Sequence, residues 1–65
     1  MDNNLVEKFE EIMEKVQNKY NKAWYEIYDS ELFDEVETNI KKELGDSILD
    51  TDEYYNWERE MYWDL

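Results

Sequence analysis

The sequence predicts an all-α protein, a small three-helix domain with one long N-terminal helix and two shorter acidic helices. Apolar residues recur every three or four positions along most of the chain, as they do on the buried faces of helices. The 65 residues include one glycine and no proline, so few positions would interrupt a helix. Eleven aromatic side chains, 17% of the chain, favour an ordered fold in spite of a formal net charge of −12. A chain of this length forms a single domain with a small core.

The first helix is expected over residues 4–28. Apolar and aromatic side chains follow one another along it at spacings of 4, 3, 4, 4, 3 and 4: Leu5, Phe9, Ile12, Val16, Tyr20, Ala23 and Ile27. Successive residues of a helix turn by about 100°, so these side chains lie on one face. Asn3 or Asn4 is expected to cap the start of this helix, which should end near Tyr28.

The second helix is expected over residues 31–44. Asp29 and Ser30 precede it, and both are residue types that favour the N-cap. Its apolar face consists of Leu32, Phe33, Val36, Ile40 and Leu44. Gly45 predicts the end of this helix, because glycine readily adopts the left-handed backbone conformation that often follows a helix.

The third helix is expected over residues 51–63. Asp50 with Glu53 three positions later is typical of a capping box, and Ser47 is an alternative cap that would lengthen the helix by one turn. The apolar stripe of this helix consists of Tyr54, Trp57, Met61 and Leu65. Tyr55, Tyr62 and Trp63 fall outside the stripe, which indicates aromatic side chains away from the core.

The negative charge is concentrated after residue 24. The first 24 residues carry five acids and four lysines, whereas the other 41 carry fourteen acids and three bases. A nucleic acid or an anionic membrane is therefore not an expected ligand, since neutralising phosphates requires a basic patch. The expected partner is a basic protein.

Enzymatic activity is not expected, and neither is a cofactor or a metal ion. The chain contains no histidine and no cysteine, so the usual near-neutral acid–base group, the thiol nucleophile and the common zinc ligands are absent. Asp50 and Asp52 imitate the first two ligands of an EF-hand loop. Tyr54 and Tyr55 then replace the third oxygen ligand and the required glycine, so helix capping is the preferred interpretation.

Two acidic groups and three aromatic residues are the candidate partner contacts. The first group is Glu26, Asp29, Glu31, Asp34, Glu35 and Glu37, the second is Asp50, Asp52, Glu53, Glu58 and Glu60, and the aromatic anchors are Tyr55, Trp57 and Trp63. Acids three or four positions apart lie about 5–6 Å apart on a helix, where they can meet lysines and arginines that normally hold phosphates. An ordinary solvated face is the alternative for the acids, and a dimer or wrap-around core is the alternative for the aromatics.

One part of the chain is similar in residue composition to the acidic tail of an anti-CRISPR inhibitor of an RNA-guided nuclease. This part is the run from Trp24 to Glu31, followed later by Lys42, Glu43 and Leu44. With its small size and strong acidity, the chain resembles phage-encoded anti-defence proteins, which include DNA-mimic anti-CRISPR and anti-restriction inhibitors. The resemblance implies an inhibitor that blocks the nucleic-acid-binding surface of a host defence nuclease or another basic protein.

Two alternatives remain open from the sequence. One is an immunity protein or antitoxin that neutralises a basic nuclease, and the other is a small structural or regulatory helical oligomer, including a homodimer. The first residues lack the basic and apolar regions of a signal peptide, and no run approaches the roughly 18 apolar residues of a membrane span. We therefore expect a cytoplasmic protein, in the host-cell cytoplasm if the chain is phage-encoded.

Overall fold

The computed structural model describes residues 4–64 and confirms the all-α class. Its elements are the helices α1 (Asn4–Tyr20), α2 (Trp24–Tyr28), α3 (Phe33–Leu44) and α4 (Asp52–Asp64), with the 3₁₀ helix η1 (Asp46–Asp50) between α3 and α4. Helices α1, α3 and α4 correspond to the three predicted helices, with α1 the longest, and α2 and η1 are additional. The predicted cap at Asn3 and the predicted stripe position Leu65 lie outside the described residues.

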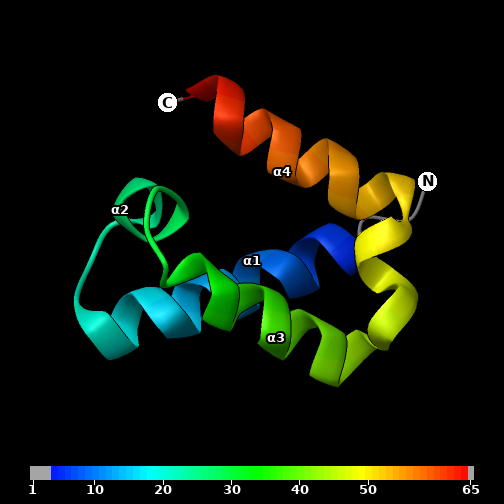
Figure 1. Cartoon of the computed structure of the whole chain (residues 1–65), viewed down its shortest axis with the longest axis horizontal. Coiled ribbons are helices and arrows are strands. Elements are labelled where there is room, and N and C mark those ends of the chain that lie inside the picture. Colours follow the sequence, from blue (N-terminus) through cyan, green and yellow to red (C-terminus); the bar gives the residue numbers. More distant parts are fainter. Residues whose placement is uncertain (1–3, 65) are drawn as a thin grey trace.

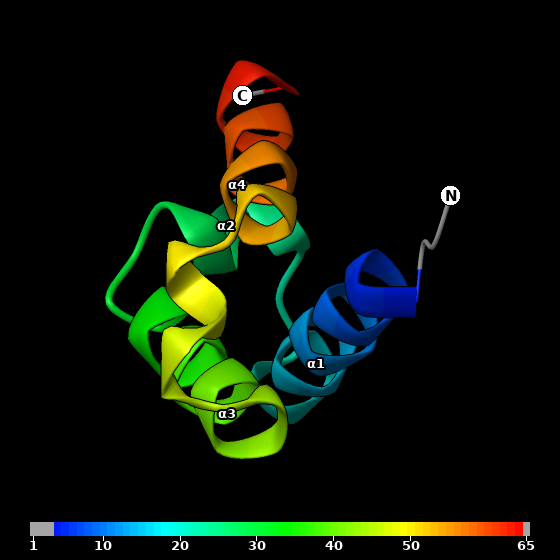
Figure 2. The same ribbon diagram turned by 90° about the vertical axis from the view of Figure 1, so that its right-hand side faces the viewer.

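Helix α1 is the element against which the others pack. It contacts α2, α3 and α4, while η1 contacts α3 and α4. Figure 1 shows α1 and α3 next to each other with α4 above them, and Figure 2 shows α1, α3 and α4 arranged around a shared interior. The apolar stripes of the three long helices therefore face the same space.

The core consists of eleven buried hydrophobic residues: Phe9, Ile12, Met13, Val16, Ile27, Phe33, Val36, Ile40, Ile48, Tyr54 and Trp57. Most of them lie on the predicted stripes. The Phe9 ring lies edge-on to Tyr54 with ring centroids 5.6 Å apart, and it lies 5.2 Å from the ring of Trp57. Aromatic pairs at these separations stabilise a core beyond the area they bury. These rings form an aromatic contact between α1 and α4.

The first helix is shorter than predicted, because it ends at Tyr20 instead of near Tyr28. Asn21 has a backbone φ of 54°, in the left-handed region, and Lys22 N–H donates to the Gln17 carbonyl at 3.0 Å. A bond of this span around a left-handed residue is the Schellman end of a helix, where asparagine is the usual substitute for glycine. Asn21 therefore ends α1, although the apolar stripe continues past it in the sequence.

After this break the chain forms the short helix α2. Ala23 precedes it, and the Ala23 N–H donates to Glu26 Oε1 at 3.0 Å, which satisfies an otherwise unpaired helix-start amide. Ile27 on α2 is fully buried. The stripe position predicted for Ile27 is thus correct, although a separate helix carries it.

Helix α3 begins at Phe33, two residues later than predicted, and ends at Leu44 as predicted. Ser30 lies in the preceding turn, where its hydroxyl donates to the Ile27 carbonyl and accepts from Leu32 N–H. Gly45 has a φ of 102°, which strongly favours glycine, and its N–H donates to the Lys41 carbonyl at 2.8 Å.

The start of α4 is capped by Thr51, so the prediction of Asp50 or Ser47 as the cap is wrong. Thr51 Oγ1 accepts from Tyr54 N–H at 3.3 Å and donates to the Ile48 carbonyl at 2.6 Å. The same hydroxyl thereby ends η1 and starts α4. Because η1 also buries Ile48, the segment predicted as a plain connection contributes to the core.

Candidate functional site

Three glutamates predicted as partner contacts accept internal hydrogen bonds from tyrosines. The pairs are Tyr20 with Glu35, Tyr54 with Glu37 at 2.8 Å, and Tyr28 with Glu58 at 3.0 Å. They join α1 to α3, α4 to α3 and α2 to α4, respectively. These three carboxylates are only partly exposed, and each already accepts a hydrogen bond within the chain, so their role as partner contacts stays a prediction.

Glu35 has a second internal partner, because Lys19 Nζ lies 2.7 Å from its Oε2. The hydrogen bond from Lys19, and then the bond from Tyr20, hold the pKa of Glu35 below its ordinary value. The same carboxylate raises the pKa of Lys19 and of Tyr20. Glu35 is thus part of a small, partly exposed polar network between α1 and α3.

The other two tyrosines of these pairs are held in their neutral form. Burial first, and the hydrogen bond to Glu58 second, raise the pKa of Tyr28 to about 12. Burial and the bond to Glu37 likewise raise the pKa of Tyr54 well above its ordinary value. A phenol beside a carboxylate donates a hydrogen bond only while it keeps its proton, so each pair stabilises the neutral tyrosine.

Four acids of the first group are exposed. We call Glu26, Asp29, Glu31 and Asp34 the α2–α3 acidic surface, because they lie on α2, in the turn after it and in the first turn of α3. No lysine or arginine occurs from residue 23 to residue 40, and Lys22 lies at the edge of a shallow depression beside Glu26, Asp29 and Glu31. One oxygen of Glu26 also caps α2.

Four acids of the second group are exposed as well: Asp50, Asp52, Glu53 and Glu60. Three of them lie at the junction of η1 and α4, whereas Glu60 lies two turns further along α4. The second group is therefore divided between two parts of the surface, which the sequence pattern did not indicate.

The three predicted aromatic anchors have different environments. Trp57 is only 5% exposed and belongs to the core, as its position on the predicted apolar stripe indicates, so little of its side chain is accessible to a partner. Tyr55 and Trp63 are 56% and 71% exposed, and the guanidinium of Arg59 lies over both rings, 5.9 Å and 4.9 Å from their centroids. Tyr25 and Tyr62 are exposed too, and the candidate contacts did not include them.

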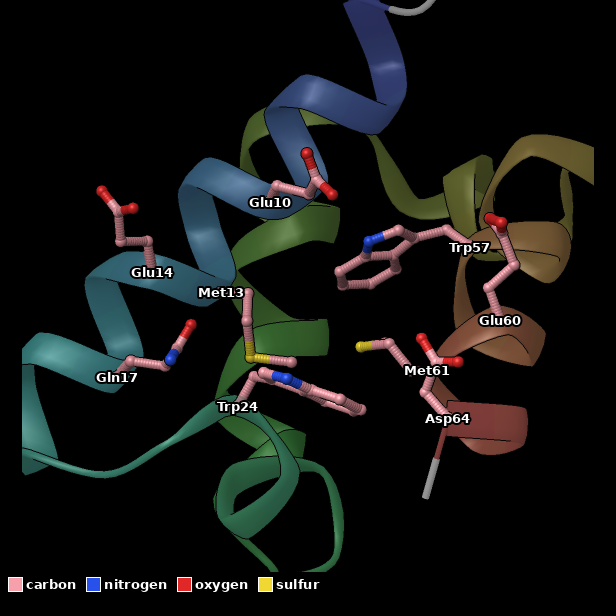
Figure 3. Close-up of a pocket in the computed structure, with 9 residues that line it drawn as sticks. All are labelled: Glu10, Met13, Glu14, Gln17, Trp24, Trp57, Glu60, Met61 and Asp64. Carbon is pink, nitrogen blue, oxygen red and sulfur yellow. The ribbon is translucent and has the colours of Figure 1, made fainter.

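A cleft of about 470 Å³ lies between α1 and α4, with α2 beside it. Figure 3 shows that the indole rings of Trp24 and Trp57 and the thioethers of Met13 and Met61 turn toward one space. Four carboxylates and one amide complete the lining: Glu10, Glu14, Glu60, Asp64 and Gln17. No lysine or arginine lines this cleft.

Of the residues that line this cleft, only Trp57 and Glu60 were predicted from the sequence as partner contacts. Glu10 and Glu14 lie one turn apart on α1, and Glu60 and Asp64 lie one turn apart on α4. This matched spacing is the signal in the sequence that could have indicated the two acidic pairs. The four carboxylates form a shared rim only because α1 and α4 pack together.

Among residues 4–64, no three or more acidic side chains lie close enough together to hold a metal ion. No helix in the same range is both long enough and apolar enough to cross a membrane. Three features make up the candidate site: the α2–α3 acidic surface, the exposed aromatics of α4 and the cleft between α1 and α4.

Comparison of the chain with protein-family models, with curated proteins and with solved structures finds no match.

Proposed function

We propose that this protein binds a basic partner protein and occupies the surface through which that partner holds nucleic acid. The observation that carries the proposal is the α2–α3 acidic surface, on which four exposed carboxylates lie close in sequence with no base among them. Neighbouring like charges destabilise a small domain. A positively charged partner would turn that unfavourable repulsion into favourable binding.

Carboxylates replace phosphates well in such a contact. Arginine and lysine form charge-assisted hydrogen bonds with either group, and arginine forms paired bonds with both. The exposed aromatics Tyr55 and Trp63 supply the rigid apolar contact area that slows dissociation from a protein partner. Binding, and not catalysis, is the proposed activity.

The resemblance to anti-defence inhibitors extends the proposal to the target. A nuclease of a host defence system, acting in the cytoplasm, has the required phosphate-binding surface. In this setting the protein is a phage-encoded anti-CRISPR or anti-restriction factor. An immunity protein or antitoxin would use the same surface, and a neighbouring toxin gene would favour that alternative.

The test compares two charge-reversed variants in affinity capture from a nuclease-treated lysate. Glu31→Lys with Asp34→Lys reverses two charges on the α2–α3 acidic surface. Glu7→Lys with Glu43→Lys is the matched control, because both residues are exposed and lie outside that surface. We expect the wild type and the control to capture the same basic protein and the first variant to lose it. Raising salt from about 50 mM to about 500 mM should release the partner.

The captured protein is then tested for nucleic-acid binding with and without the wild-type chain. Displacement of its nucleic acid supports the proposal. Simultaneous binding of the chain and the nucleic acid would contradict it, as would equal capture by both variants.

The exposed aromatics favour one second candidate, a homo-oligomer formed through α4. Tyr55, Tyr62 and Trp63 are each more than half exposed on this one helix, and aromatic residues are enriched in protein interfaces. Analytical ultracentrifugation tests this candidate directly. A mass that rises with protein concentration supports the oligomer, and a constant monomer mass removes it.

A further inference from the structure

The cleft between α1 and α4 combines an apolar floor with a negatively charged rim. Its floor is formed by two indole rings and two thioether side chains, and Trp57 is almost fully buried there. Its rim carries the carboxylates of Glu10, Glu14, Glu60 and Asp64. Its volume of about 470 Å³ lies within the range of small-ligand sites. The cleft can therefore take a side chain or a small organic group.

The rim determines the charge of the occupant. An anion would be repelled by four carboxylates, and no basic side chain in the lining offsets them. A neutral apolar group would cover these carboxylates without giving them a partner, which is unfavourable. A cation with an apolar stem satisfies both parts of the cleft, because its stem covers the floor and its charge faces the rim.

The floor favours a guanidinium over an ammonium group. A guanidinium is planar and weakly hydrated, so it stacks on aromatic rings while its N–H groups bond to carboxylates in pairs. Tryptophan is the best aromatic partner for such a cation. The same chain contains this chemistry on another face of α4, where Arg59 lies 4.9 Å from the ring centroid of Trp63.

We propose that the cleft between α1 and α4 binds an arginine side chain presented by the partner protein. The arginine stem lies against Met13, Met61 and the indole of Trp24, and its guanidinium bonds to carboxylates from both helices. This inference rests on the proposed function for the source of the arginine. The affinity of the cleft for an arginine side chain does not depend on which protein presents that arginine.

The test uses a probe peptide and needs no identified partner. An acetylated and amidated Gly-Arg-Gly tripeptide is titrated into the full chain while the indole N–H signals of Trp24, Trp57 and Trp63 are followed by NMR. We expect the signals of Trp24 and Trp57 to shift and that of Trp63 to move less, because Trp63 lies outside the cleft. The same peptide with citrulline or lysine in place of arginine should bind more weakly.

A matched pair of variants assigns the binding to the rim. Glu10→Gln with Glu60→Gln removes one carboxylate from each helix, whereas Glu43→Gln with Asp46→Asn removes two exposed carboxylates that do not line the cleft. We expect the rim variant to bind the arginine peptide about tenfold more weakly and the control variant to bind it nearly as the wild type does. Both variants keep the α2–α3 acidic surface intact.

The outcomes separate the two proposals. Equal shifts in the rim and control variants, or stronger binding of the citrulline peptide, would overturn the arginine site while leaving the proposed function standing. Arginine-specific shifts that disappear in the rim variant support the site even if no partner is captured through the α2–α3 acidic surface. Trp24 and Trp57 shifts that follow protein concentration without peptide would assign the cleft to a second copy and overturn the proposal.

Discussion

The hydroxyl of Tyr54 on α4 donates a 2.8 Å hydrogen bond to the carboxylate of Glu37 on α3. Both helices pack against α1 and η1, so this bond closes a ring of contacts around the core. The ring of Tyr54 is buried against Phe9, whereas Glu37 is half-buried at the margin. Glu37, which the charge pattern assigns to the surface, thus helps to hold α3 and α4 together.

Tyr54→Phe is expected to lower the free energy of unfolding by about 1 kcal/mol, because it removes the hydrogen bond and keeps the buried ring. Tyr55→Phe is the matched control, since Tyr55 is exposed and should change stability by less than about 0.5 kcal/mol. Urea denaturation followed by circular dichroism measures both values. Equal effects of the two changes would show that the bond to Glu37 contributes nothing.

Alkaline pH is expected to destabilise the fold through Tyr28. Its pKa of about 12 in the folded protein exceeds the ordinary value of 10.0, so folding favours the neutral phenol. The stabilisation is fully present below pH 10 and is lost as pH rises from about 10 to about 12. The urea midpoint should fall over this interval, and it should fall less in Tyr28→Phe. A wild-type midpoint unchanged up to pH 12 would rule out this role.

Core truncation in α1 is expected to be severe for so small a domain. Ile12 is 2% exposed, and Ile12→Ala should cost about 2–5 kcal/mol. A domain of this size has about 3–5 kcal/mol of net stability, so the alanine variant should be largely unfolded. Ile12→Val should cost only about 0.5–1.5 kcal/mol and stay folded. Thermal unfolding measured by circular dichroism distinguishes these outcomes, and a folded Ile12→Ala variant would contradict the packing.

Adjacent acids on α3 are expected to respond differently to charge reversal. Asp34 is exposed, and no internal ion pair or hydrogen bond of its carboxylate occurs among the described residues. Asp34→Lys should therefore leave the fold intact and weaken partner binding. Glu35→Lys should instead destabilise the fold, because it replaces the acceptor of Lys19 and Tyr20 with a positive charge. Unfolding temperatures that fall equally in the two variants would show that the Lys19–Glu35–Tyr20 network adds no stability.

Helical periodicity predicted the larger part of the core correctly. Phe9, Ile12 and Val16 lie on the stripe predicted for the first helix, and all are buried. The end of α3 at Gly45 was likewise predicted from one residue. The end of α1 at Asn21 was missed, because an apolar stripe that continued to Ile27 hid a single left-handed residue.

The sequence by itself determined the helical class, the apolar face of each long helix and the acidity of the second half of the chain. These are local properties, since spacing along a helix decides which side chains share a face. The tertiary structure alone decided that Glu37 bonds to Tyr54 and that acids of α1 and α4 share one rim. The physical reason is that each of these depends on how segments far apart in the chain pack together, which the periodicity within one segment does not specify.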